Sequence, residues 1–79
     1  MEIKVVGSGC TNCKTLLQRT QEAVRDLQSD AQILYVTDME DIIATGVLRT
    51  PGLIINGQIK IAGRVPSVKE IKQLISQAN

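Results

Sequence analysis

The stretch that decides the fold is Gly7-Ser8-Gly9-Cys10-Thr11-Asn12-Cys13-Lys14. It follows a strand-like run at residues 2–6 and precedes a helix-like run at residues 11–28. The glycines before the first cysteine permit a sharp turn, because glycine accepts positive φ without steric cost. Two thiols separated by two residues, where a strand turns into a helix, indicate a redox pair.

The two sulfurs are expected to differ in exposure. The side chains that recur near the helical period form one stripe, made of Cys13, Leu16, Leu17, Thr20, Val24 and Leu27. This pattern turns Cys13 inward and leaves Cys10 at the helix tip, facing solvent. Free N–H groups and the helix dipole favour a thiolate at the tip by about 0.3–1 kcal/mol. We therefore expect Cys10 to be the more acidic thiol, and the Lys14 ammonium would add to this effect if it folds back.

A disulfide between Cys10 and Cys13 would stabilise the fold only weakly. In the chain-entropy model, closing a loop of about 4 residues contributes about 1.9 kcal/mol, against about 3 kcal/mol for a loop of about 15 residues. A small chain gains more from a cross-link between distant segments. The spacing therefore favours thiol–disulfide exchange over a structural cross-link.

Length and composition exclude several functional classes. The chain has 79 residues, 43% of them apolar, which is enough for one small domain. Tyr35 is the only aromatic residue and the net charge is +1, so we expect no nucleic-acid partner. No apolar run approaches roughly 18 residues, so we expect no membrane span.

The residue types also bear on compartment and chemistry. Glu2 and Lys4 lie among the first apolar residues, unlike a signal peptide, so we expect the cytoplasm, where a structural disulfide would be unusual. The chain has no histidine, which removes imidazole bases and Cys/His zinc patterns. We expect no resident metal and no cofactor.

The middle of the chain continues the alternation of strand and helix. A second strand is expected at residues 31–36 and a short helix around residues 42–44. Thr37 and Glu40 fit a capping box at the start of this helix, and Gly46 fits its C-cap.

The last third of the chain predicts a hairpin and a helix. Asn56-Gly57 separates the apolar runs 53–55 and 58–62, and this dipeptide is the strongest short-range signal for a hairpin. Ser67 and Glu70 fit a second capping box, which opens a final helix.

The resulting order is β-α-β-α-β-β-α. The first two strands, joined by a helix, should be parallel with a right-handed crossover, and the hairpin should add two antiparallel strands. The prediction is an α/β fold with a four-stranded mixed sheet and helices on both faces.

At this point the sequence resembles the thioredoxin-like superfamily in its smallest form. It is most similar to the small thioredoxin- or glutaredoxin-like proteins called redox-active disulfide protein 2. The resemblance rests on Gly9-Cys10-Thr11-Asn12-Cys13-Lys14, Thr50-Pro51-Gly52-Leu53, Ile55-Asn56-Gly57 and Gly63-Arg64-Val65-Pro66-Ser67. It implies a single thioredoxin-like domain over residues 1–79 and an enzyme that exchanges disulfides with protein substrates. Its partners would be those substrates and an upstream reductase, and we expect a monomer.

The resemblance also implies roles for particular residues. Cys10 would be the nucleophile and Cys13 the resolving thiol. Pro51 would be a cis-proline opposite the thiols, and the Thr50 backbone would pair with the substrate chain. The residues alone would fit an ordinary trans-proline that starts a strand, and only the resemblance favours cis over the low base rate of cis X-Pro bonds.

The remaining residues of the motif have supporting roles. Gly9 provides the turn, Lys14 a nearby positive charge, and Thr11 and Asn12 are expected to donate hydrogen bonds to sulfur. Thioredoxins carry a buried acid six residues before the first cysteine, where this chain has Lys4. We expect the Lys4 side chain to reach the edge of the sheet rather than to serve the thiols. The proton of the second thiol would go to water, to the departing thiolate or to a neighbouring side chain.

Two other functions fit a pair of cysteines. Copper-type metal-binding modules place CxxC after a first strand, and thiolates suit Cu(I). Their βαββαβ order ends on a strand, whereas this chain is predicted to end on a helix. The other function is a non-catalytic redox-sensing adaptor, in which oxidation of the pair changes partner binding. The apolar residues Val47, Leu48 and Leu53 are candidates for the rim of a docking surface around the thiols.

Overall fold

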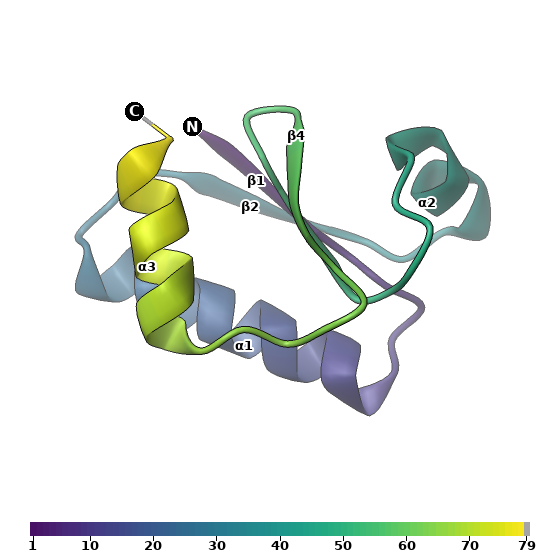
Figure 1. The fold of residues 1–79 in the computed structure, drawn as a ribbon, viewed down its shortest axis with the longest axis horizontal. Coiled ribbons are helices and arrows are strands. Elements are labelled where there is room, and N and C mark those ends of the chain that lie inside the picture. Colours follow the sequence, from purple (N-terminus) through teal and green to yellow (C-terminus); the bar gives the residue numbers. More distant parts are fainter. Residues whose placement is uncertain (79) are drawn as a thin grey trace.

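The structure is a computed structural model that describes residues 1–78. It has the predicted order of strands and helices (Figure 1). The elements are β1 (Glu2–Val6), α1 (Thr11–Asp26), β2 (Gln32–Val36), α2 (Met39–Thr45), β3 (Gly52–Ile55), β4 (Gln58–Ala62) and α3 (Val68–Gln77). Within the described residues, the helix α3 follows the hairpin β3–β4, as in the thioredoxin-like order and unlike the βαββαβ order of the metal modules.

The four strands form one mixed sheet in the order β2-β1-β3-β4. β1 and β2 are parallel, whereas β3 is antiparallel to both β1 and β4. Asn56 and Gly57 both have positive φ, at 50° and 81°, as the tight turn between β3 and β4 requires. The predicted mixed sheet is confirmed, and β1 and β3 are its two central strands.

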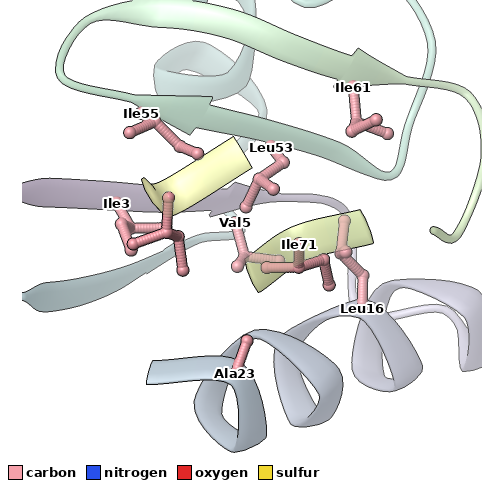
Figure 2. Packing of buried hydrophobic residues seen from close by; sticks show 9 residues of the cluster. Ile3, Val5, Leu16, Ala23, Leu53, Ile55, Ile61 and Ile71 are labelled. Carbon is pink, nitrogen blue, oxygen red and sulfur yellow. The ribbon is translucent and has the colours of Figure 1, made fainter. Parts of the chain in front are cut away.

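The main core lies between one face of the sheet and two helices, α1 and α3. Alternate residues along β1 and β3 point to this face, because successive side chains of a strand point to opposite sides. Figure 2 shows these buried side chains. The cluster consists of Ile3, Val5, Leu16, Ala23, Leu53, Ile55, Ile61, Ile71 and Ile75.

The opposite face of the sheet carries a smaller core beneath α2. Val6 of β1 and Ile54 of β3 pack there with Ile42 of α2 and with Val47. Val6 and Ile54 directly follow Val5 and Leu53, which face the main core, so their side chains point to the opposite face of the sheet. The sheet therefore has helices on both faces, as predicted.

The helix caps agree with the sequence in part. Thr37 was predicted as the N-cap of α2, and this is wrong by one residue. The N-cap is Asp38, whose Oδ1 accepts a hydrogen bond from the Glu40 N–H at 2.9 Å. Aspartate caps as well as threonine does, so the pattern alone did not separate these neighbours. Gly46 ends α2 in the left-handed region, as predicted.

The second predicted capping box forms only half of its bonds. The Ser67 hydroxyl accepts from the Glu70 N–H at 3.1 Å, as expected. The Glu70 carboxylate does not complete the box, because it accepts hydrogen bonds from the Arg64 guanidinium, with Nη1 to Oε1 at 2.9 Å. This hydrogen bond, together with the positive charge, lowers the pKa of Glu70. Within residues 1–78, none of the helices has the length and apolar character needed to cross a membrane.

Candidate active site

Cys10 and Cys13 are joined by a disulfide at the start of α1. Their Cα atoms are 5.0 Å apart. Cys10 is exposed, whereas Cys13 has 0% of its surface accessible. This difference is the one that the helical stripe predicted, since Cys13 lies one turn below the tip on the buried side of α1.

Cys10 is the N-cap of α1, with an extended backbone. Its Sγ accepts a hydrogen bond from the Cys13 N–H at 3.2 Å, and its carbonyl accepts from the Lys14 N–H at 3.0 Å. A sulfur in this position meets the free N–H groups at the positive end of the helix dipole. In the reduced protein a Cys10 thiolate would receive a charge-assisted hydrogen bond, which is stronger than one to a neutral sulfur.

The loop between α2 and β3, which contains Pro51, lies at the same end of the sheet as the loop between β1 and α1, which leads to Cys10 (Figure 1). Gly52, the first residue of β3, is paired with Val6, the last residue of β1, and the cysteine loop follows Val6 directly. The Thr50–Pro51 peptide bond is cis. Pro51 is buried and its carbonyl accepts from the Gly63 N–H at 2.8 Å, whereas Thr50 is exposed.

A hollow of about 330 Å³ opens between the two loops and α2. Ser8 of the cysteine loop and Thr50 of the proline loop form part of its wall. Its remaining lining is apolar and consists of Met39, Ile42, Ile43, Val47 and Leu48. Leu48 is 95% exposed, Ile43 69% and Met39 64%, so this apolar surface is open to solvent.

This hollow changes the predicted rim of the site. Leu48 belongs to the rim, and Val47 lies at its base with 6% exposure. Leu53 was a wrong candidate, because it is fully buried in the main core. Met39 and Ile43 were not predicted as part of the rim, although their spacing of four residues places them on one side of a helix. That side differs from the buried one, which Ile42 occupies.

The supporting residues of the motif surround Cys10 in different ways. Gly9 has φ of +91°, so it makes the turn as expected. Thr11, Asn12 and Lys14 are exposed. Among residues 1–78, the hydrogen bond to a cysteine sulfur comes from the backbone of Cys13 and not from Thr11 or Asn12.

Lys4 lies apart from this arrangement. It alternates with Ile3 and Val5, which face α1 and α3, so its side chain is on the opposite face of the sheet. Its side chain is 35% exposed, and Nζ is 3.7 Å from Oε1 of Glu2. The ammonium therefore pairs with Glu2 of the same strand rather than with the thiols, as expected, and that it reaches the edge of the sheet stays a prediction.

The fold and the site together define a class of protein. A CxxC disulfide at the start of a helix, beside a cis-proline loop on a small mixed sheet, is the arrangement of thioredoxin-like redox proteins. The comparison with known families agrees, since the chain belongs to the thioredoxin domain family, which matches residues 1–76.

Two relatives support this assignment. A thioredoxin of Methanothermobacter thermautotrophicus is 41% identical over 76 residues, which cover 96% of this chain and 99% of the relative. A thioredoxin of Methanocaldococcus jannaschii is 39% identical over 71 residues, which cover 90% of this chain and 81% of the relative. The protein is a thiol–disulfide oxidoreductase with a CxxC redox pair.

Proposed function

We propose that Cys10 is the nucleophile and Cys13 the resolving thiol in the reduction of protein disulfides. The observation that carries this proposal is the contrast in exposure, with Cys10 open to solvent and Cys13 fully buried. An exposed sulfur at the helix tip can approach the disulfide of another protein. A buried sulfur can reach only a sulfur that is already attached to Cys10.

The reaction has two exchange steps. The Cys10 thiolate attacks one sulfur of the substrate disulfide, so that a mixed disulfide forms and one substrate thiolate leaves. The Cys13 sulfur then attacks Cys10, the Cys10–Cys13 bond forms and the second substrate thiol is released. Two electrons pass to the substrate, the first substrate sulfur leaves as a thiolate, and the proton of the Cys13 thiol ends on the second substrate sulfur. A dithiol reductase upstream would return the protein to its reduced form.

The substrate would bind across the proline loop and the apolar hollow. Thr50 is exposed, and no hydrogen bond recorded among residues 1–78 uses its backbone N–H or carbonyl. An extended substrate segment can therefore pair with this backbone, as a strand pairs with a free sheet edge. An apolar side chain near the substrate cysteine would fill the hollow beside Leu48. We further propose that the protein works as a monomer in the cytoplasm, where CxxC pairs serve exchange rather than cross-linking.

Turnover with a protein disulfide tests the proposed function. With dithiothreitol as the reductant, the wild-type protein should reduce many equivalents of an oxidised protein that has an accessible disulfide. Cys10→Ser should lose this activity to the level of dithiothreitol alone, because no other exposed thiol exists in the chain. If Cys10→Ser reacts faster than dithiothreitol alone, Cys10 is not the nucleophile. A single stoichiometric exchange by the wild type would favour a redox-sensing adaptor instead.

Leu48→Ser tests the docking hollow. Removing this exposed side chain should raise KM for a protein disulfide by about tenfold, since burying a leucine is worth about 1.5–3 kcal/mol and the contact is partial. The rate with a small aromatic disulfide, which needs no docking surface, should stay unchanged.

Leu27→Ser is the matched control, because Leu27 is a second leucine with an exposed side chain but lies at the far end of α1. It should leave KM for the protein substrate at the wild-type value. An equal rise in KM for both variants would mean that the hollow is not the docking surface.

A further inference from the structure

Gly7 follows β1 and is buried, although its backbone does not require glycine. Its N–H continues the pairing with β2 by donating to the Val36 carbonyl at 3.0 Å. Gly7 is not among the glycines with positive φ, in contrast to Gly9 at +91°. Residue 7 therefore lies outside the left-handed region in which glycine is favoured. The reason for a glycine must lie in its surroundings.

The residue that lies against Gly7 is Cys13, the resolving cysteine. A Cβ atom built on Gly7 would overlap the Cys13 sulfur and lie only 2.8 Å from the Cys13 Cβ. Cys13 has little freedom to move away, because its backbone is in the first turn of α1 and its N–H donates a hydrogen bond to the Cys10 sulfur. Rotation of the Cys13 side chain would move the sulfur but would leave its Cβ in place.

We propose that Gly7 is a positioning residue for the resolving step. The missing side chain leaves the space in which the Cys13 sulfur lies, and this space sets where Cys13 meets Cys10. The proposal rests on the assignment of Cys13 as the resolving thiol. The proposal gives the two glycines of the loop different roles. A Cβ on Gly9 would meet nothing within 4 Å, so Gly9 serves the turn alone.

The two exchange steps should respond differently to a side chain at residue 7. The first step forms the bond between Cys10 and the substrate sulfur, and it takes place on the exposed side of the helix tip. The second step forms the Cys10–Cys13 bond and breaks the bond to the substrate, so it requires Cys13 in line with that bond. A displacement of about 1 Å can slow such a step by about 100-fold.

A single-turnover reaction with a symmetrical aromatic disulfide measures both steps in one experiment. Attack by Cys10 releases the first coloured aromatic thiolate, and attack by Cys13 releases the second. In Gly7→Ala we expect the first phase at the wild-type rate and the second phase slower by about 10- to 100-fold. Both phases at the wild-type rate would overturn the proposal.

Gly57→Ala is the matched control. Gly57 has φ of +81° in the distant hairpin, and a Cβ there would meet nothing within 4 Å. This variant loses stability through backbone strain but should show both phases at the wild-type rate. Slowing of both phases to the same extent in Gly7→Ala would point to a general loss of structure and contradict a positioning role.

A second measurement covers the case in which Gly7→Ala folds poorly. Gly7→Ala should lower the thermal midpoint of the reduced protein less in a Cys13→Gly background than in the wild type, because both overlapping atoms of residue 13, the sulfur and the Cβ, are then absent. An equal loss in both backgrounds would overturn the proposal. Failure of the proposed function would give a different result: the wild type would then release the second thiolate no faster than Cys13→Ser does.

Discussion

Replacing Cys13 by serine is expected to trap the protein in covalent complexes with its disulfide substrates. Cys10 remains exposed at the tip of α1 and can still attack a substrate, but the thiol that would release the product is gone. The mixed disulfide can then be cleaved only by a thiol from solution. Because an intramolecular thiol has a far higher effective concentration, the lifetime of the complex should increase by at least about 100-fold.

The trap is measured in cell extract after free thiols have been blocked. Cys13→Ser should accumulate adducts that are stable without reductant and are released by dithiothreitol, and the released proteins identify the substrates. Cys10→Ser is the control with the same substitution, and its buried remaining thiol should capture nothing. Equal adducts from both variants, or adducts from Cys10→Ser alone, would reverse the proposed roles of the two cysteines.

Leu53→Ala is expected to remove a large part of the stability of the fold. Leu53 is fully buried between the sheet and the helices α1 and α3 (Figure 2). Truncation of a buried leucine costs about 2–5 kcal/mol through lost burial and the cavity left behind. A domain of this length has a free energy of unfolding of only roughly 4–12 kcal/mol, at about 0.05–0.15 kcal/mol per residue.

Urea unfolding of the reduced proteins measures this loss as a lower midpoint. Leu48→Ala is the matched control, because it makes the same truncation at a leucine that is 95% exposed. Its free energy of unfolding should differ from that of the wild type by no more than about 0.5 kcal/mol. Similar midpoints for the two variants would mean that Leu53 does not have the packing described above.

The difference between these two leucines shows where the sequence analysis was insufficient. Both Leu48 and Leu53 were candidates for an apolar rim around the thiols, and only Leu48 is in it. An apolar side chain in a strand fits either face of a sheet. Which face is buried against which helix follows from the pairing of β3 with β1, whose partner residues lie far apart in the chain.

The capping patterns show a related limit. Ser67 caps α3 as its sequence pattern predicts, because the hydroxyl and its N–H partner are three residues apart. The Glu70 carboxylate binds Arg64 instead of completing the capping box. Whether the carboxylate accepts from a backbone N–H or from a guanidinium depends on where the preceding loop places the arginine. The helix pattern contains no information about the position of that loop.

By itself, the sequence determined the order of the elements, the hairpin turn and the inward orientation of Cys13. These features depend on the periods of strand and helix and on the backbone freedom of glycine, which act over a few neighbouring residues. Only the tertiary structure decided that β1 and β3 are central, that the Pro51 loop and α2 line a hollow beside the cysteine loop, and that Gly7 leaves space for the Cys13 sulfur. Those features are contacts between parts of the chain that meet only when the sheet has formed, so no local pattern could specify them.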